Sequence, residues 1–463
     1  MTDSRKTCDP TRTNGSPRAA LVDPSKTERN PRGMFGSLRV RNYRLFASGQ
    51  VISNVGTWMQ RIAQDWLVLE LSGYDPVALG IAASLQFLPT LLFTLWAGVL
   101  ADRHDKRRML VVVQAGMAAC ALVLGTLDLT GLVQLWQVYA LCLVFGMFTA
   151  VDPPVRQSFV GEMVGKEHLT NAVALNSSMF NLARVVGPAI AGVMIIWTGT
   201  GWVFLVNALT TVAVIVNLVR MNPAELYRQP RPASRRGQLR EGLRYVRGRP
   251  DILIVLTMVL FVSTFAFTFF TTLAIAAANV FHRDADGYGL LSTMLAVGTL
   301  SGALLAVRRS TKSRPSMGLL VGAAFTFGVL EVGTGLMPTY LAFGLALIPT
   351  GIAMITFMTT ANSTIQLATA PEMRGRVMAL YMLVFVGGNP IGAPMTGWLA
   401  AEFGGRAPFV VGGVVAALSA VVCGVVLARR GGVTVRDRMR TARWTRGRAR
   451  RNQARNLERA DAA

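Results

Sequence analysis

A group of polar side chains stands in an otherwise apolar stretch near the start of the chain. Residues 43–71 form a segment long enough to cross a lipid bilayer as one helix, and it contains Gln60, Arg61, Gln64 and Asp65. Arg61 and Asp65 are four residues apart, so they share a helical face and can pair. We expect this face to line a central cavity, where Asp65 exchanges protons in competition with substrate. The alternative is a static ion pair that fixes the rotation of the helix.

Ionisable residues in two other apolar segments are candidates for related roles. A charge inside a lipid-spanning segment is costly, so a functional role is the first hypothesis for it. Glu331 is a second candidate for proton coupling, or one member of a local polar pair. Arg184 is expected to attract anionic groups of a substrate, or to pair with Asp65 or Glu331. The predicted cavity and substrate residues are Gln60, Arg61, Gln64, Gln86, Asn181, Arg184 and Asn389. Hydrogen bonds between helices explain several of the uncharged ones without any ligand.

The sequence offers no set of residues for enzymatic catalysis or metal binding. Its three histidines, His104, His168 and His282, lack the spacing of metal ligands, and no nucleophile and base converge in one motif. The phosphate-binding pattern Gly-x4-Gly-Lys-Ser/Thr does not occur. We therefore expect no enzyme, no cofactor and no metal, and no direct use of ATP.

The composition is that of a membrane protein. Hydrophobic residues make up 52% of the 463 residues and charged residues only 15%, against about 25% in soluble domains. Long apolar segments must be helical in lipid, because a lone strand leaves its backbone polar groups unsatisfied. We therefore predict an all-α membrane protein with 12 transmembrane helices. The predicted spans are 43–71, 77–100, 109–128, 134–152, 171–197, 201–219, 251–280, 287–307, 317–337, 339–368, 375–401 and 407–428.

The net charge of +23 is concentrated in three segments. Residues 1–42 carry +5, residues 220–249 carry +7 and residues 429–463 carry +9. Lys and Arg are retained on the cytoplasmic side, so we place both termini in the cytosol, in the plasma membrane of a bacterium. Trp444 is the only aromatic residue of the last segment, so we expect attraction to anionic lipid and no nucleic-acid partner. Further basic connections lie at 101–108, 153–168, 308–314 and 371–376.

An internal repeat divides the chain into two similar halves. At an offset of 205 residues, Ala174, Leu175, Phe180, Gly187, Gly192, Gly199 and Phe204 recur as Ala379, Leu380, Phe385, Gly392, Gly397, Gly404 and Phe409. Two six-helix bundles in the same orientation, with the substrate site between them, produce such a repeat. The predicted organisation is a disordered basic cytoplasmic tail (1–42), an N-terminal bundle (43–219), a basic cytoplasmic linker with room for a short helix (220–250), a C-terminal bundle (251–428) and an Arg-rich cytoplasmic tail (429–463).

The hairpin between the second and third spans carries a resemblance to a known family. Gly98, Leu100, Asp102, Arg103, Lys106 and Arg107 have the identity and spacing of the hairpin signature of the major facilitator superfamily. The resemblance implies a fold of two pseudo-symmetric six-helix bundles. Asp102 can accept hydrogen bonds at a helix N-terminus, where the dipole favours an anion. We predict that Gly98, Asp102, Arg103, Arg107 and Arg156 form a cytoplasmic gate, which latches the halves and releases as they rock apart.

A second signature occupies the fifth predicted span. Residues 184–192 resemble the Gly-Pro motif of antiporters in the same superfamily, and they contain Gly187, Pro188 and Gly192. The two glycines let a neighbouring helix approach, and the proline removes a backbone hydrogen bond and permits a bend. The motif favours export, and ordinary close packing of helices is the alternative.

More narrowly, residues 35–428 resemble the branch that includes the enterobactin exporter and the macrolide-efflux proteins, through 42–46, 65–71, 152–157 and 371–377. This implies a secondary active transporter that exports amphipathic small molecules, such as drugs, macrolides or siderophores, by alternating access and proton antiport. The alternatives are a proton-coupled nutrient importer and a non-transporting membrane sensor. The expected partners are a small-molecule substrate, protons and membrane lipid, and we expect a monomer.

Overall fold

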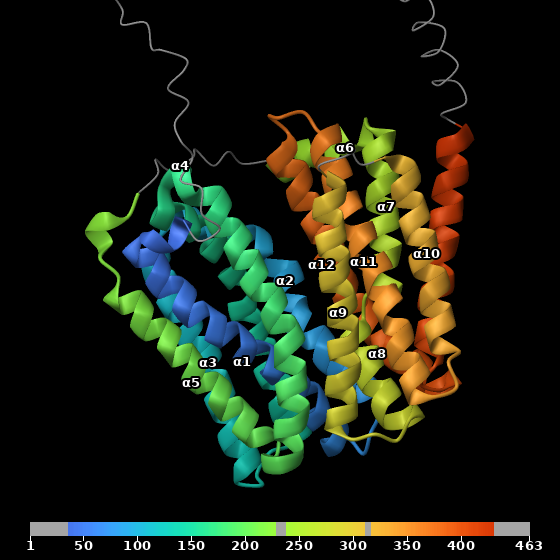
Figure 1. Ribbon diagram of the computed structural model, residues 1–463, viewed down its shortest axis with the longest axis horizontal. Coiled ribbons are helices and arrows are strands. Elements are labelled where there is room, and N and C mark those ends of the chain that lie inside the picture. The colour runs from blue at the N-terminus through green and yellow to red at the C-terminus, as the bar shows by residue number, and fades with distance from the viewer. Residues whose placement is uncertain (1–35, 228–237, 311–315, 430–463) are drawn as a thin grey trace, which may run out of the picture.

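The computed structural model describes residues 36–227, 238–310 and 316–429, which fold into long helices (Figure 1). The helices of the first half are α1 (Arg41–Leu71), α2 (Pro76–Arg103), α3 (Lys106–Leu129), α4 (Leu135–Thr198) and α5 (Thr200–Arg220). Those of the rest are α6 (Gln238–Arg247), α7 (Pro250–Phe265), α8 (Phe269–Ile275), α9 (Ala285–Ser310), α10 (Met317–Gly335), α11 (Tyr340–Ala368), α12 (Arg374–Phe403) and a last span, Ala407–Arg429.

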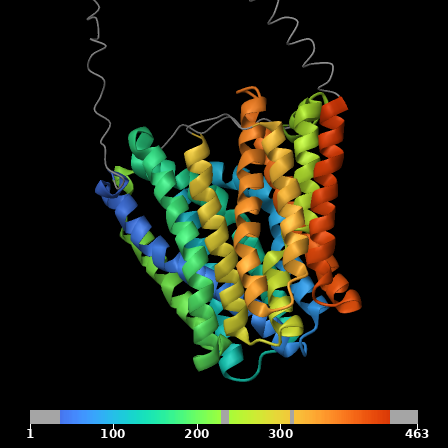
Figure 2. The same cartoon turned by 45° about the vertical axis from the view of Figure 1, so that its right-hand side comes forward.

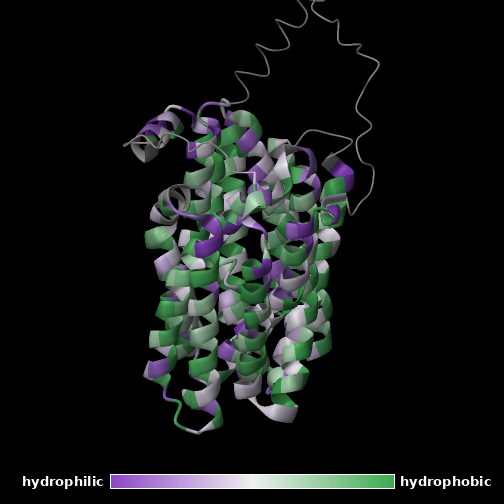
Figure 3. Ribbon diagram, turned by 90° about the vertical axis from the view of Figure 1, so that its left-hand side faces the viewer, coloured by the Kyte–Doolittle hydropathy of each residue, from purple (hydrophilic) through white to green (hydrophobic). Residues whose placement is uncertain are grey.

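Within these ranges, 11 helical segments are long and apolar enough to cross a membrane. α1 is not among the 11 because its polar residues lower its hydropathy, yet it is 31 residues long and packs against α4 and α5 inside the bundle. The chain is therefore an all-helical membrane protein, as predicted. Large apolar side chains are exposed on the helices, among them Trp197 at 82% and Leu209 at 71%, and suit contact with lipid. Figure 3 shows hydrophobic residues, in green, along much of the length of the helices.

The helices before and after α6 form two groups that lie side by side (Figure 1). Contact between the groups is made mainly by two pairs of helices, α2 with α12 and α4 with α9, and to a lesser extent by α1 and α2 with α8 and by α1 with α9. Figure 2 shows α9 in yellow running along the green second part of α4. α6 and the bend in the middle of α4 lie at one end of the molecule, and the connection between α3 and α4 lies at the other.

The fourth span is longer than predicted. Residues 153–168 were expected to connect two spans, but the helix continues to a bend at Gly165, whose φ is 67°. Val155, Phe159 and Met163 recur every fourth residue and are fully buried against the helices around Tyr43, so this stretch has its own apolar face. The prediction was wrong because the helix continues on its buried apolar face, and the charge of Arg156 is balanced by an ion pair with Asp152 one turn earlier.

The seventh predicted span, 251–280, is interrupted. α7 ends at Phe265, α8 begins at Phe269, and a short π-helix, Ala276–Val280, follows. α12 approaches this break closely, because a methyl group at Gly392 would overlap the Thr264 carbonyl oxygen at 1.9 Å. Next to it, the Thr268 and Thr396 hydroxyls share a hydrogen bond of 2.9 Å. The break between α7 and α8 therefore lies at a close contact with α12, which is formed at a glycine and at a pair of threonines.

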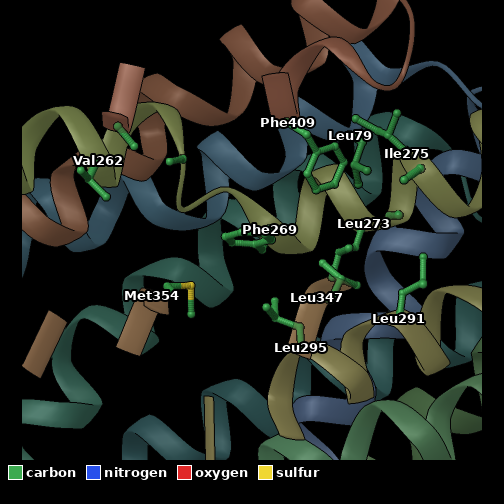
Figure 4. Close-up of a cluster of buried hydrophobic side chains, with 14 of the residues drawn as sticks. Leu79, Val262, Phe269, Leu273, Ile275, Leu291, Leu295, Leu347, Met354 and Phe409 are labelled. Atoms are coloured by element: carbon green, nitrogen blue, oxygen red, sulfur yellow. The ribbon is translucent and has the colours of Figure 1, made fainter. Parts of the chain in front are cut away.

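The buried core continues through both groups of helices. Figure 4 shows part of it, in which Phe269, Leu273 and Ile275 of α8 pack with Leu291 and Leu295 of α9. Leu79 of α2 belongs to the same cluster, so apolar packing also joins the two groups. This packing holds α8 and α9 against the first half, at the level where the polar residues of α1 lie.

Candidate functional site

The carboxylate of Asp65 lies at the joint between the two halves, and its side chain is only 1% exposed. Arg61 Nε donates a hydrogen bond of 3.3 Å to Asp65 Oδ2, from one turn earlier on α1. The Tyr288 hydroxyl, on α9 of the other half, donates to the same oxygen over 2.9 Å. A single buried oxygen therefore accepts hydrogen bonds from both halves.

Arg61 is held by residues of three helices. Its Nη1 donates to Gln86 Oε1 on α2 over 3.0 Å, and Gln64 Nε2 donates to the same oxygen over 3.3 Å. The guanidinium also stands over the ring of Phe87, at 5.0 Å, and over that of Phe270, at 5.5 Å. These cation–π contacts and charge-assisted bonds fix Arg61 between α1, α2 and α8.

A chamber of about 150 Å³ opens beside this cluster. It is lined by Asn54, Thr57, Trp58, Gln60, Arg61, Gln64, Gln86, Phe87, Phe145, Thr149 and Phe180. Four of the predicted cavity residues are among them, with aromatic rings on the facing walls. Ligand pockets usually measure about 300–1,000 Å³, so a drug-sized molecule fits only after the chamber widens.

Two larger cavities flank α10, with volumes of about 460 and 500 Å³. The first cavity has an apolar lining. The second is also mainly apolar, but its lining includes Arg309, Thr326 and Thr356. Neither contains the buried charges found around Asp65. Size alone therefore does not identify the functional chamber, whereas its polar groups do.

Arg184 stands over the ring of Trp58, with its Cζ 5.8 Å from the ring centroid. Neither predicted ion pair forms, since Asp65 pairs with Arg61 and Glu331 lies on α10. Arg184 thus faces a wall of the chamber without an anionic partner among the residues that the structure describes.

Three predicted residues lie away from the chamber. Asn181 is turned to its own helix and donates to the Ser177 carbonyl over 2.8 Å. Asn389 is half-buried on α12 and does not line the chamber. Glu331 is 3% exposed beside Gly412 and the end of α7, and its Oε2 has no hydrogen-bond partner in the described part of the chain.

The predicted gate is described only in part. Gly98, Asp102 and Arg103 belong to the last turns of α2, and their side chains lie outside the described residues. Arg107 donates from Nε and Nη2 to the carbonyls of Leu218 and Val219, over 2.6 Å each, and so caps the end of α5.

Arg156 also bonds within the first half, where it forms an ion pair with Asp152. Asp152 in turn accepts a 2.9 Å hydrogen bond from Gln114. Asp105 accepts from a backbone N–H at the start of α3, that of Arg108, over 3.0 Å, whereas the bond predicted for Asp102 lies outside the described residues. The gate residues that the structure describes thus hold α3, α4 and α5 together. Among their described bonds, none reaches the second half.

Glycines bring the halves together at the end opposite α6. A methyl group at Gly289 of α9 would lie 2.5 Å from the Pro188 carbonyl oxygen, and one at Gly192 would lie 3.0 Å from that of Ala285. On the other side, a methyl group at Gly80 of α2 would lie 2.6 Å from the Ala393 carbonyl oxygen. Gly187 instead packs against Trp58 of its own half. These contacts form a seal between the halves, made mainly of backbone atoms.

Two residues at the site, Tyr288 and Phe270 of the second half, were not anticipated as partners there. Asn207, whose side chain donates to Gln60 Oε1, makes one of the hydrogen bonds between helices that were expected of uncharged polar residues. Tyr288 lies 223 residues from Asp65 in the chain, so no local spacing relates them. The only sequence signal for Tyr288 was a tyrosine within an apolar span, which is equally typical of ordinary packing.

A buried ion pair where two groups of membrane-spanning helices meet, beside a chamber lined by the first group, is typical of a membrane transporter. Residues 32–445 match the family described as transmembrane secretion effector, and the chain belongs to this family of the major facilitator superfamily. It is therefore a transporter and not an enzyme.

Curated relatives are similar over most of the chain. Staphyloferrin A transporter of Staphylococcus aureus is 28% identical over 295 residues, which cover 62% of this chain and 72% of the relative. Macrolide efflux protein A of Streptococcus pyogenes is 22% identical, with coverage of 85% and 97%. Enterobactin exporter EntS of Citrobacter koseri is 25% identical, with coverage of 72% and 79%.

Solved structures share the fold. A bacterial homologue of the human lysosomal transporter Spinster, in an inward-facing and occupied conformation, aligns with a TM-score of 0.66 at 14% identity, over 84% of this chain and 96% of the homologue. The POT family transporter PepTSo aligns with a TM-score of 0.67 at 11% identity, over 83% and 97%. At these identities the likeness establishes the major facilitator fold.

Proposed function

We propose that the protein exports amphipathic small molecules, of drug, macrolide or siderophore type, in exchange for protons. The observation that carries the proposal is the Asp65 carboxylate, which is buried at the joint of the halves and bonded to both of them. The names of the relatives support the direction, since they include a macrolide efflux protein and an enterobactin exporter.

Asp65 links protonation to the movement of the halves. While the halves touch, its carboxylate accepts from Tyr288 and Arg61. When they separate at this end, the Tyr288 bond breaks and water reaches the carboxylate, which then takes up a proton. Protonation breaks the ion pair between Asp65 and Arg61, so the walls that held the substrate rearrange, the substrate leaves and the empty halves close again. Once Asp65 is bonded to Arg61 and Tyr288 again, its carboxyl gives the proton to the cytosol.

The orientation of the transporter follows from its charges. The basic ends of the chain and the α6 region face the cytosol of a bacterium, in its plasma membrane, because Lys and Arg are retained on that side. The glycine seal between α4 and α9 then lies on the outer side. The structure corresponds in this orientation to the inward-facing state of the cycle, and the transporter acts as a monomer.

The proposal is tested by substituting Asp65→Asn in the full-length protein. Cells that carry wild-type protein should accumulate less erythromycin and less 1-anilinonaphthalene-8-sulfonate than cells without it, and a protonophore should remove the difference. The introduced amide keeps the shape of the side chain but cannot exchange a proton, so efflux should fall to the level of cells without the gene, with protein still present in the membrane.

Glu70→Gln is the matched control, because Glu70 is a carboxylate on the same helix that bonds to Trp66 and does not line the chamber. It should leave efflux within about twofold of wild type. Unchanged efflux in the Asp65 variant would show that this carboxylate takes no part in transport. Efflux that persists with the protonophore would show that a proton gradient does not drive it.

A further inference from the structure

Arg184 is a charged side chain for which the fold supplies no counter-ion among the described residues. It lies near the middle of the second part of α4, Glu167–Thr198, and is half-buried. Its described contact is with the face of Trp58, at 5.8 Å. A charge inside a membrane protein is ordinarily paired, or it lines a pathway for solute. None of the described carboxylates pairs with Arg184, so Arg184 is expected to line a pathway for solute.

The surroundings of Arg184 belong to the chamber. Trp58, over which it stands, lines the chamber and contacts Phe180 at 5.6 Å and Phe270 at 5.3 Å between ring centroids. Phe180 is one helical turn before Arg184 on the same helix. The guanidinium thus lies at the rim of an aromatic wall, where a ligand resting on the rings can reach it.

The charges of the chamber do not balance. Arg61 and Asp65 neutralise one another, so Arg184 adds one positive charge in excess, counted over the described residues at these walls. A guanidinium matches the two oxygens of a carboxylate, sulfonate or phosphate, and its weak hydration makes exchange of water for such a group favourable.

We propose that Arg184 and Trp58 form the subsite for an anionic head group of the transported molecule, whose planar or apolar body lies against Trp58, Phe180 and Phe270. The substrate class is therefore an amphipathic organic anion. This inference rests on the proposed function, because it assumes that the chamber is where substrate binds.

The test uses two dyes with the same rings, 1-anilinonaphthalene-8-sulfonate and the uncharged N-phenyl-1-naphthylamine. Dissociation constants are measured on purified full-length protein without a proton gradient, and transport is measured in proteoliposomes with one. Wild type should bind the sulfonate more tightly. Arg184→Gln should weaken sulfonate binding about tenfold, equivalent to about 1.4 kcal/mol, and leave the uncharged dye within about twofold. Arg184→Lys should retain part of the preference.

Arg283→Gln is the control, because Arg283 also stacks on an aromatic ring, that of Tyr340 at 5.3 Å, but does not line the chamber. It should change neither dissociation constant. An equal loss for both dyes in Arg184→Gln, or no loss for either, overturns the subsite even if transport persists. Arg184-dependent binding without transport under a proton gradient contradicts the proposed function and leaves the subsite standing.

Discussion

The hydrogen bond between Tyr288 and Asp65 affects the equilibrium between two arrangements of the halves. A hydrogen bond to a charged group contributes about 1.5–3 kcal/mol, and this one exists only while the halves touch at that end. A difference of about 1.4 kcal/mol is a factor of ten in an equilibrium constant. The phenol therefore affects how often the halves separate at this end.

We accordingly expect Tyr288→Phe to open this end more often, by about tenfold or more in the equilibrium constant. The readout is the labelling rate of Ser84→Cys, a half-buried position whose hydroxyl donates to the Pro390 carbonyl across the seal. Tyr340→Phe is the control, because its hydroxyl bonds to Gly287 within one half. Equal labelling rates in both variants would mean that the Tyr288 hydroxyl does not hold the halves together.

Glu331 gives a second prediction for a single residue. Its Oε2 is buried without a hydrogen-bond partner among described residues, and such a group costs about 1–3 kcal/mol. Glu331→Met has a similar volume and no such group, so we expect a higher melting temperature of the purified protein. Proton-driven efflux measured on the same variant tests the proposed coupling role. Loss of efflux from a more stable protein would support that role, and a lower melting temperature would contradict the cost assigned to this carboxyl.

At the residue scale, sequence reasoning could predict contacts within a helix but not between helices. The Arg61–Asp65 pair follows from a spacing of four, and the structure contains it. The bonds of Arg61 to Gln86 and of Asp65 to Tyr288 depend on how α1 meets α2 and α9, which no local spacing contains. The alternatives left open for Arg184 had the same origin, since its partner depended on which helices meet.

Among the elements, α4 carries the sharpest local constraint. Gly165 adopts φ 67° and ψ −175° at the bend between its two spans, a conformation essentially restricted to glycine that costs a residue with a side chain about 1–3 kcal/mol. We expect Gly165→Ala to destabilise the protein by that amount, measured as a lower melting temperature. Gly161→Ala, one turn earlier in regular helix with Leu169 3.9 Å from the added methyl group, should be neutral or slightly stabilising. Equal effects of the two substitutions would mean that the bend does not depend on glycine.

The positions of the helices were largely predictable, because a span needs a fixed length of apolar sequence and polar connections end it. The errors fall where a helix does not follow that rule. At 153–168 a helix continues beyond the apolar stretch, with one apolar face buried, and at 266–268 an apolar stretch continues through a break. Hydropathy averages over a window and therefore registers neither a one-sided helix nor a three-residue interruption.

For the molecule as a whole, the orientation can be tested directly. In a Cys8→Ser background, whose remaining cysteines are buried, an impermeant maleimide should label Leu132→Cys in intact cells, because Leu132 is exposed in the connection between α3 and α4. His104→Cys, in the exposed connection between α2 and α3, should be labelled only after permeabilisation. The reverse pattern would invert the orientation and with it the direction of transport.

The division into two halves was readable from the repeat, but their relative placement was not. A repeat reports that the two bundles are similar, whereas the end at which they touch is a choice between states of nearly equal free energy. The glycines that make the contact, such as Gly192 and Gly289, recur for packing in many helices, and nothing in their local sequence says which helix lies opposite.

The backbone character of the glycine seal has a consequence for repeated cycling. Most of its contacting atoms belong to the main chain, at Gly80, Pro188, Gly192, Ala393 and Gly289. Such surfaces have no side-chain torsions to freeze on approach, whereas ordering a long side chain costs up to about 2 kcal/mol of rotational entropy. Each closure therefore begins from surfaces already in their final shape. Only the few side-chain bonds that cross the joint, such as that of Tyr288 to Asp65, then have to be ordered, so the loss of side-chain entropy at each closure is small.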